Sequence, residues 1–430
     1  MIVLAWAFVA LFALLFWGVP LGFGMGLVGA AGFAIIVGWV PTLHVIGQIA
    51  YDSVLNYNLS VVPLFVLMGQ LFAHSRMADE LYDASYAFVG HMAGGMAIAT
   101  IFACGAFSAV SGSSLACAAA MTAVAAPNMK KFNYDDGFAA GTIAAGSTLD
   151  ILIPPSIVMV IYAILTQVEL GKLMIAGFLP GLVLIAFYIV AIVVVTKVWP
   201  NLGPPGQRSP WSVRLARLKE VWAMVVLFAI SLCGIYLGVF TPTEAAGVGA
   251  FGAFAIAVAR RRLTRQAFLR MLADATTTTS TIFFVVIGAL IFANLVTVSG
   301  AGEAIQSWVR GLGLSQMELM FALLGIYILL GCVLDASAMT VLTVPIFYPI
   351  IMQAGIDPIW FGIFIIIVVG IGLIHPPMGM LLLIVKSLIP GISMKELLKG
   401  VAPYLVADAA AIGLMIAYPQ IVLVLPNLMP

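Results

Sequence analysis

The chain has 430 residues, of which 63% are hydrophobic and only 8% are charged, and its net charge at pH 7 is +1. A soluble domain carries about 25% charged residues, so this composition excludes a soluble globular protein and indicates a membrane protein. The net charge by itself says nothing about nucleic acid, but the sequence has no basic tract suited to binding it. We therefore expect an all-α polytopic membrane protein.

The apolar runs, separated by polar turns, predict about ten membrane spans. In chain order these cover about residues 2–19, 21–40, 60–75, 137–166, 173–196, 221–239, 243–259, 276–299, 358–390 and 400–425. Stretches at 76–91 and 301–313 are expected to be arms along the membrane surface. The polar stretch 200–220 predicts a cytoplasmic linker that divides the chain into residues 1–199 and 221–430.

The start of the chain is interpreted as the first membrane helix rather than a signal peptide. It lacks a positive n-region, because the first Lys or Arg is Arg76. The chain has four cysteines, namely Cys104, Cys117, Cys233 and Cys332. They lie in apolar segments without the paired spacing of a metal site, so we expect packing residues rather than ligands or disulfides.

Two apolar stretches, at about 92–127 and 316–352, contain a polar break in the middle. The first break is Ser111-Gly112-Ser113-Ser114, and the second runs from Gly331 to Ser337 and includes Asp335. Non-helical backbone at membrane depth is tolerated only where it is buried in protein or lines a cavity. The pattern therefore favours two re-entrant hairpins, although a small-residue helix with packed serines is the alternative for the first.

Two predicted spans carry a double proline near the middle. Pro154-Pro155 interrupts residues 137–166, and Pro376-Pro377 interrupts residues 358–390. Two adjacent prolines remove two backbone donors and break a helix. Both spans are therefore predicted to be broken helices.

The distribution of charge supports the re-entrant interpretation. If both ends of the first hairpin face the cytoplasm, 16 of the 18 Lys and Arg residues lie inside, as the positive-inside rule requires. Only Lys172 and Arg310 then lie outside, and the second hairpin enters from the opposite face. Treating either hairpin as a full span would invert the topology that follows it and spoil this agreement.

The two halves repeat the same order of elements. Each half reads arm, hairpin, broken span, and each has an Ala-Met-Thr triplet followed by a proline at the same offset, Pro127 or Pro345. Because the charge pattern gives the halves opposite topology, we expect an inverted repeat. Paired broken elements in inverted repeats are typical of secondary transporters, whose binding sites lie between the repeats at the membrane midplane.

The two tips are the predicted binding sites. Unwound carbonyls with hydroxyl and carboxylate oxygens suit Na⁺, a hard cation, and the N-termini of half-helices favour an anionic substrate group. The candidate ion ligands are Ser111, Gly112, Ser113, Ser114, Gly146 and Thr148 for one site, and Gly331, Asp335, Ser337, Gly370, Gly372 and His375 for the other. The candidate substrate contacts are Ser114, Asp150, Pro154, Pro155, Ser156, Pro376 and Pro377.

Three acidic residues lie at apparent membrane depth, where an ionisable group is a functional hypothesis by default. Asp335 is expected to serve function because it lies at a hairpin tip. Asp150 could bind an ion, carry a proton or cap the broken helix, and Asp408 is expected to pair with a neighbouring helix. His375 could be a ligand or a proton site, but a hydrogen-bonded helix end is the preferred interpretation.

Three stretches together resemble a known family across essentially the whole chain. They are SGSSLACAAAMTAVAAPNMKKFNYDDGFAAGTIAAGSTLDILIPPSIVMVIYAI, then GVFTPTEAAGVGAFGA, and finally LDASAMTVLTVPIFYPI with GIDPIWFGI and GLIHPPMG. They are similar to the large membrane subunit of tripartite ATP-independent periplasmic (TRAP) transporters, the DctM-type permease. The resemblance implies an elevator-type carrier in the bacterial inner membrane that takes up organic acids with Na⁺, at two or more ion sites.

The resemblance also implies two partners, a small four-helix membrane subunit of DctQ type and a periplasmic substrate-binding protein of DctP type. The chain departs from the family pattern at Asp150, where Gly is frequent, and at His375, where Thr is frequent. Both positions lie beside the expected ion sites, so involvement of protons is a further hypothesis. The substrate and the oligomeric state are left open.

Three alternatives are weighed against this interpretation. A stand-alone sodium- or proton-coupled dicarboxylate symporter would need no binding protein. A channel is disfavoured because two opposed hairpins with paired breaks indicate alternating access. An intramembrane hydrolase using Ser111 or a neighbouring serine lacks a nearby histidine and a GxSxG motif, so we expect that the chain is not an enzyme.

Overall fold

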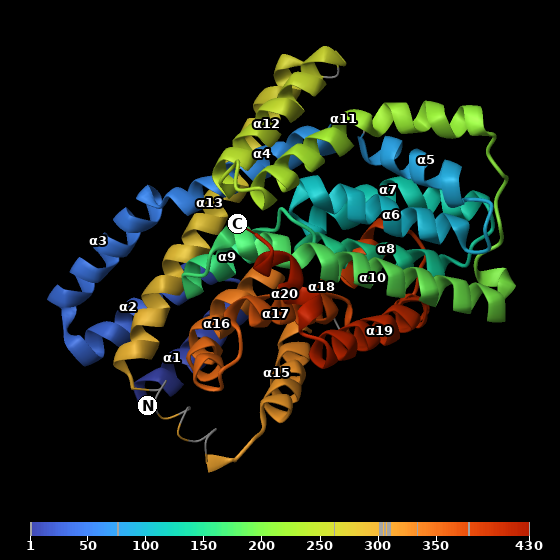
Figure 1. The fold of residues 1–430 in the computed structure, drawn as a ribbon. Helices are drawn as coiled ribbons and strands as arrows, with labels where there is room; N and C mark the ends of the chain where they lie inside the picture. Colours follow the sequence, from blue (N-terminus) through green and yellow to red (C-terminus); the bar gives the residue numbers. More distant parts are fainter. Residues whose placement is uncertain are drawn as a thin grey trace.

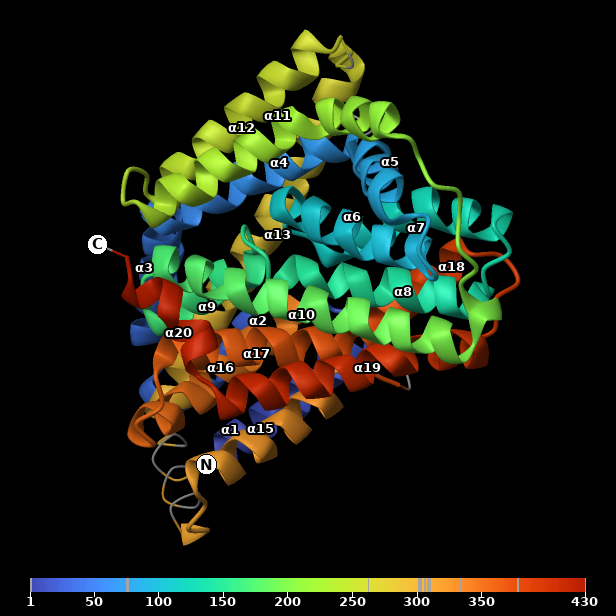
Figure 2. The ribbon, with the colours of Figure 1, turned by 45° about the vertical axis from the view of Figure 1, so that its right-hand side comes forward.

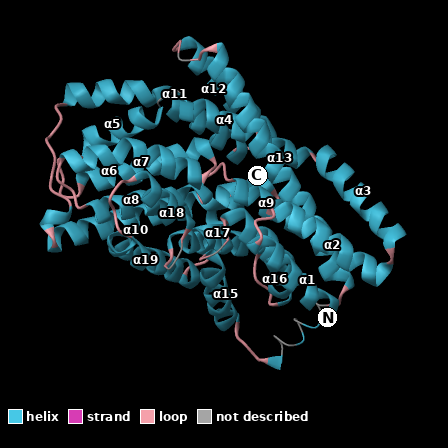
Figure 3. Ribbon diagram, turned by 180° about the vertical axis from the view of Figure 1, so that it is seen from behind, coloured by secondary structure: helices cyan, strands magenta, loops and turns pink. Residues whose placement is uncertain are grey.

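The computed structural model describes residues 2–74, 77–261, 263–300, 304, 307, 311–332, 334–376 and 379–429. Arg76, Arg262, Arg310 and Pro377 lie outside the described residues, as does most of the predicted arm at 301–313. Throughout the described ranges the secondary structure is helical, without a strand (Figure 3).

The helices of the first half are α1 (Ile2–Phe16), α2 (Leu21–Val37), α3 (Trp39–Leu55), α4 (Val61–His74), α5 (Met77–Val89), α6 (Gly95–Ser111), α7 (Ser114–Lys131), α8 (Asp136–Thr148), α9 (Ile157–Thr166) and α10 (Leu170–Val198). Those of the second half are α11 (Trp211–Tyr236), α12 (Pro242–Ala259), α13 (Arg265–Val298), α15 (Gln316–Gly331), α16 (Ala336–Gln353), α17 (Pro358–Ile374), α18 (Met380–Leu388), α19 (Met394–Ala417) and α20 (Gln420–Asn427). Short 3₁₀ turns lie at Tyr57–Ser60, Leu149–Ile151 and Pro200–Leu202.

The described helices include several that are long and apolar enough to cross a membrane. There are six of these, α10, α11, α12, α13, α16 and α19, or up to seven if α3 and α4, which meet at a 55° bend, form one span. Shorter apolar helices such as α6, α9 and α17 accompany them. The chain is therefore a multi-pass membrane protein. The last ten residues of the predicted linker, 211–220, form the start of α11.

Side-chain caps define where the central helices begin. Asp135 and Asp357 accept hydrogen bonds from the first backbone N–H groups of α8 and α17, and Ser113 and Asp335 do the same for α7 and α16. These caps satisfy donors that have no partner inside a helix. The helices α12, α15 and α19 begin instead with a Ser or Thr paired to a Glu three residues later, which is a capping box.

Landmarks of the two halves recur at a constant spacing of 222 residues. The pairs are Ser113 and Asp335 (335 minus 113), Asp135 and Asp357 (357 minus 135), and Pro154 and Pro376 (376 minus 154). The Ala-Met-Thr triplets at 120–122 and 338–340 are 218 apart (338 minus 120) and do not share this spacing. The structural landmarks therefore relate the halves in a different register from the triplets.

The helices form two groups (Figures 1 and 2). In one group α2 packs along α13, and α4 packs against α12 and α13, with α11 beside α12. In the other, α8 packs against α6, α7, α18 and α19, while α17 packs against α10, α15, α16 and α19. Every residue of α8 from Gly137 to Thr148 and every residue of α17 from Trp360 to Ile374 is buried. The first halves of the two broken helices therefore lie at the centre of the protein.

Glycines allow the closest helix crossing in this central group. A Cβ atom on Gly400 of α19 would lie 1.8 Å from the carbonyl oxygen of Gly137 on α8, and one on Gly141 would lie 2.3 Å from the carbonyl carbon of Gly400. No side chain fits between backbones this close, so only glycine permits the approach. The crossing brings the first half of α8 alongside α19, toward the end of α8 that is opposite the break.

Candidate functional site

The first hairpin and the first broken helix meet through a buried hydrogen bond. Helix α6 ends at Ser111, and the Ser111 hydroxyl donates to Asp150 Oδ1 over 2.7 Å. Asp150 lies in the 3₁₀ turn that follows α8, with 0% of its surface exposed, and Ser111 is 7% exposed. Two residues that the sequence predicts for the site are thus brought into contact across 39 positions of chain.

The turn at the tip depends on Gly112, whose φ of 63° lies in the left-handed region. A Cβ atom there would lie 3.2 Å from the carbonyl oxygen of Pro155, so the tip rests directly on the double proline. On its other side the tip approaches α4, where a Cβ atom on Gly69 would lie 2.6 Å from the Ser111 carbonyl oxygen. The first tip is therefore held between the break and α4.

Within the described ranges, two buried side-chain oxygen atoms of the first break lack a hydrogen-bond partner. Asp150 Oδ2 and Ser156 Oγ have no hydrogen-bond partner among the described residues, although both residues are almost fully buried. Ser113 Oγ accepts from the Ala116 N–H as the cap of α7, and Ser114 is buried beside it. An unpartnered carboxylate oxygen and hydroxyl are costly to bury unless something binds them. This donor set fits a hard cation such as Na⁺.

The two broken helices touch at the same level. A Cβ atom on Gly370 of α17 would lie 2.9 Å from the Ile151 side chain and 3.6 Å from Cβ of Thr148. Gly370 therefore lies against the end of α8, where Thr148 is the last helical residue. Gly146, two residues earlier, faces Cys104 of α6, whose thiol would lie 2.8 Å from a Cβ atom at this position.

The second hairpin meets the second broken helix through a close backbone approach and one thiol contact. A Cβ atom on Gly331 would lie 2.4 Å from Cα of Gly372, and Cys332 Sγ lies 3.3 Å from the Pro376 carbonyl oxygen. Asp335 is exposed and caps α16 by accepting from the Ala338 N–H, while Ser337 is half-buried. The structure thus brings Gly331 and Gly372 together and shows Asp335 as a helix cap.

His375 ends α17 and lines an apolar pocket between α15 and α19 with Phe321, Leu405 and other apolar side chains. Its Nδ1 atom has no hydrogen-bond partner in the described part of the chain. Its hydrogen bonds are made by the backbone, with Gly372 and Gly379. The preferred interpretation of this histidine as the end of a helix agrees with this position.

A chain of hydroxyl groups joins the end of α8 to α10 and α19. The Tyr188 hydroxyl lies 3.0 Å from Thr148 Oγ1 and donates to Asp408 Oδ1 over 2.7 Å. The sequence predicts a helix-pairing role for Asp408 but does not single out Tyr188. A tyrosine within an apolar span carries no local signal of its partner, since Tyr188 and Asp408 are 220 positions apart.

No group of three or more His, Cys, Asp or Glu side chains clusters among the described residues. The polar side chains of the first break are hydroxyls and the single carboxylate of Asp150, whereas His375 and the Cys332 thiol lie at the second. The oxygen ligands of the first break suit a hard ion rather than a transition metal.

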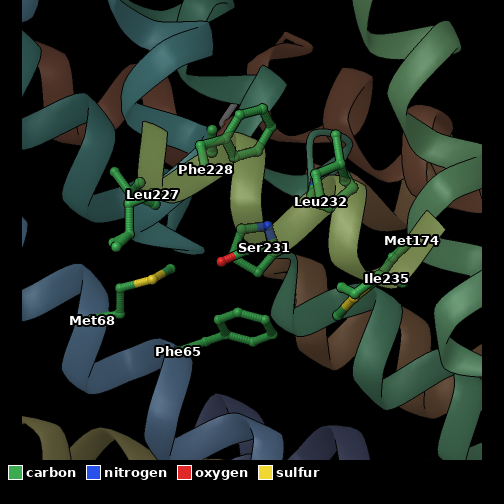
Figure 4. A pocket seen from close by; sticks show the side chains of 12 residues that line it. Phe65, Met68, Met174, Leu227, Phe228, Ser231, Leu232 and Ile235 are labelled. Carbon is green, nitrogen blue, oxygen red and sulfur yellow. The ribbon is translucent and has the colours of Figure 1, made fainter. Parts of the chain in front are cut away.

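An apolar pocket separates the first tip from α11. Figure 4 shows Phe65 and Met68 of α4 facing Leu227 and Ser231 of α11 across this space. The complete lining is Phe65, Met68, Ala109, Val110, Pro154, Pro155, Met174, Leu227, Phe228, Ser231, Leu232 and Ile235. Pro154 and Pro155, predicted as substrate contacts, therefore present an apolar surface on this side.

Helical hairpins whose tips meet helix breaks, in a multi-pass membrane protein, are typical of secondary transport proteins. A family model described as "Tripartite ATP-independent periplasmic transporter, DctM component" matches residues 8–421. The chain belongs to this family. The predicted family resemblance is confirmed.

Relatives whose substrates are named are also TRAP transporter large permeases. The C4-dicarboxylate TRAP transporter large permease protein DctM of Pseudomonas aeruginosa is 36% identical over 378 residues, covering 88% of this chain and 88% of that protein. The sialic acid TRAP transporter large permease protein SiaM of Vibrio cholerae is 31% identical over 417 residues, covering 96% of each chain. These relatives are permeases, which confirms the expectation that the chain is not an enzyme.

Two further comparisons concern size and fold. The isethionate TRAP transporter permease protein DctMQ of Oleidesulfovibrio alaskensis is 30% identical over 402 residues, which cover 93% of this chain and 62% of that longer protein. The YdaH transporter of Alcanivorax borkumensis superposes with a TM-score of 0.65 over 90% of this chain and 91% of that chain, at 14% identity. This second likeness concerns the fold alone.

Proposed function

We propose that this chain is the large membrane subunit of a Na⁺-coupled transporter that takes up an organic anion across the bacterial inner membrane. The observation that carries the proposal is the family match over residues 8–421. Relatives are named for C4-dicarboxylates, sialic acid, 2,3-diketo-L-gulonate and isethionate, which are all organic anions. We therefore propose an organic acid or a related anion as the substrate.

The sodium part of the proposal is supported by the donor atoms at the first break. Asp150 Oδ2 and Ser156 Oγ are buried without partners among the described residues, and the Ser111 hydroxyl on the hairpin tip donates to Asp150 Oδ1. Oxygen ligands of this kind suit Na⁺. The helices α7, α9, α16 and α18 all begin near the breaks, and their N-termini favour a negatively charged substrate group.

An elevator mechanism in an inverted repeat is the proposed mode of transport. Helix α7 of the first hairpin packs against α18, the far half of the second broken helix, and α16 of the second hairpin packs against α9 in the same way. Each hairpin thus packs against the broken helix of the other half. This packing, together with the 222-residue spacing of the helix caps and double prolines, supports a pseudo-two-fold relation between the halves. We assign the hairpins and broken helices to a moving body, and α2, α4, α11, α12 and α13 to a static frame.

Two partners complete the proposed assembly. TRAP large permeases act with a small membrane subunit and a periplasmic substrate-binding protein. The longer DctMQ relative carries the names of the large subunit, DctM, and the small subunit, DctQ, together. We propose that both partners exist as separate chains for this permease.

Uptake into proteoliposomes tests the proposal. The permease is reconstituted with its small subunit, the binding protein is added outside, and Na⁺ and pH gradients are set independently. We expect uptake of a labelled organic acid that requires the binding protein and an inward Na⁺ gradient. Uptake indifferent to Na⁺ would refute sodium coupling, and a dependence on the pH gradient alone would indicate protons.

The alternative within transport is a stand-alone symporter. The closed packing of the first tip against α4 and the double proline is compatible with either system. Omitting the binding protein from the same assay separates them, because a stand-alone symporter transports at an undiminished rate without it.

A further inference from the structure

A hydrogen-bonded chain connects the end of the first broken helix to a buried acid outside the two breaks. Tyr188 of α10 lies between Thr148 of α8 and Asp408 of α19. Tyr188 is 0% exposed, Asp408 1% and Thr148 3%. Asp408 Oδ2 has no hydrogen-bond partner among the described residues. Burying a carboxyl with only one hydrogen-bond donor costs free energy, so such a group in a membrane protein is a candidate functional residue.

The number of hydrogen atoms shared by Thr148, Tyr188 and Asp408 decides whether the Thr148 oxygen is available to bind a cation. Thr148 Oγ1 lies 2.7 Å from the Ala145 carbonyl oxygen and 3.0 Å from the Tyr188 hydroxyl oxygen, but it carries one hydrogen. When Asp408 is ionised, Tyr188 donates to it and cannot also donate to Thr148. The Thr148 oxygen then receives no hydrogen bond from Tyr188, and its lone pairs are free to bind a cation.

A neutral Asp408 that carries its hydrogen on Oδ1 reverses the direction of these hydrogen bonds. Its carboxyl hydrogen is donated to Tyr188, Tyr188 donates to Thr148, and Thr148 donates to the Ala145 carbonyl. Each hydroxyl is then satisfied, and one lone pair of Thr148 is occupied. The negative charge that would attract a cation toward the end of α8 is also absent.

We propose that Asp408, acting through Tyr188, is a positioning residue that presents the Thr148 oxygen to the coupling cation, so that a proton at Asp408 and Na⁺ at the first break oppose each other. The inference rests on the proposed sodium coupling and adds a residue outside both breaks. Asp408 does not itself touch the ion in this arrangement.

Few titratable groups face Asp408. Tyr188 comes from α10, and Tyr404 comes from the same helix as Asp408. Helices α17 and α20 contribute no titratable side chain, as their sequences show. Asp136 lies in the first turn of α8, at the opposite end of that helix from Thr148. Lys386 lies in the last turn of α18. The other charged residues of α19 lie in its first two turns.

The same helices provide a matched control. The Tyr404 hydroxyl lies 2.6 Å from Thr142 Oγ1 on α8, and Thr142 donates to the Phe138 carbonyl. This is again a buried tyrosine paired with a threonine of α8, but six positions before Thr148. The rings of Tyr188 and Tyr404 pack edge to face at 5.5 Å, so their surroundings are alike. Y404F removes a comparable hydrogen bond without reaching the break.

The experiment measures Na⁺ binding to the purified full-length permease rather than transport. NaCl is titrated against choline chloride at constant ionic strength, at about pH 6 and about pH 8, with calorimetry and thermal stabilisation as readouts. We expect D408N and Y188F to raise the half-saturating Na⁺ concentration about tenfold at the higher pH, and Y404F to change it less than about twofold. In the wild type the half-saturating concentration rises at the lower pH, and D408N loses most of that rise although it retains Asp150.

The outcomes separate the two hypotheses. If the wild type shows no Na⁺ binding by either readout, the proposed sodium coupling fails and the inference fails with it. If the wild type binds Na⁺ and both Y188F and D408N match Y404F, sodium coupling stands and the role of Asp408 is overturned. D408E, which keeps the charge, is expected to bind Na⁺ more tightly than D408N. Y188F alone decides the question if an Asp408 variant does not fold.

Discussion

Gly400→Ala is expected to destabilise the protein by separating α8 from α19. The added Cβ atom would lie 1.8 Å from the Gly137 carbonyl oxygen, whereas ordinary contacts begin at 3.4 Å, so the backbones must move apart by about 1.6 Å (3.4 minus 1.8). Inserting atoms into a packed core costs about 1–3 kcal/mol, and backbone neighbours cannot rotate away as a side chain can. The intrinsic helical preference of alanine offsets about 0.5–1 kcal/mol of this.

The same movement strains two buried hydrogen bonds of α19, one across the crossing to α8 and one to α10. Tyr404 and Asp408 follow Gly400 on α19 and are bonded to Thr142 and Tyr188. A separation greater than 1 Å takes hydrogen bonds of 2.6–2.7 Å beyond useful range. Because a bond contributes about 1 kcal/mol net, we expect a total loss of about 2–4 kcal/mol in the free energy of unfolding.

Gly413→Ala is the matched control, because it lies on the same helix and a Cβ atom there has nothing within 4 Å. Thermal unfolding of both variants is followed in detergent by intrinsic fluorescence and near-UV circular dichroism. We expect Gly413→Ala to leave stability within about 1 kcal/mol of the wild type or to raise it. If Gly400→Ala unfolds together with Gly413→Ala, the close approach of α8 and α19 is refuted.

Three further changes test the tip, the cap and the surface arm. Gly112→Ala is expected to cost about 1 kcal/mol or more because φ is 63° and Pro155 is close, and Gly391→Ala, with φ of 87° and open space, measures the backbone strain alone. Asp335→Ala is expected to lower stability by about 1 kcal/mol through loss of the α16 cap, whereas Asp335→Asn retains the cap. Stable Asp335→Asn protein with lost Na⁺-dependent uptake would identify the carboxylate charge as a functional requirement, and full uptake would leave it as a cap only. Glu80→Gln, at the 2.6 Å ion pair with Arg260 whose side chains are 13% and 22% exposed, is expected to cost about 1–2 kcal/mol, measured as a lower unfolding midpoint. An unchanged midpoint would show that this pair does not hold α5 to α12.

Local chemistry in the sequence predicted the breaks. Gly112 permits the left-handed turn at which α6 ends, and a double proline lacks two backbone donors. Both effects are properties of the residues themselves. The low proportion of charged residues predicted the membrane class in the same way. These features need no knowledge of what lies next to them in space.

Contacts between distant segments could not be predicted in this way. Ser111 reaches Asp150 across 39 positions and Tyr188 reaches Asp408 across 220, and no periodicity in either segment identifies the partner. The relation between the halves was also hidden. The Ala-Met-Thr triplets suggest a spacing of 218, whereas the helix caps and double prolines share a spacing of 222. The caps follow the backbone, so they preserve the relation that the triplets miss.

At that spacing, Asp150 in the first half corresponds to Gly372 in the second (372 minus 150). One position therefore closes its hairpin with an exchangeable hydrogen bond from Ser111, and the other closes it with two glycine backbones in contact. The Asp150 carboxylate can exchange its hydrogen bond for an ion or a proton by rotation of one side chain. The contact between Gly331 and Gly372 opens only if the two helices move apart. Asp150 and Gly372 thus close their hairpins in different ways, one through a side chain that can exchange its partner and one through packed backbone.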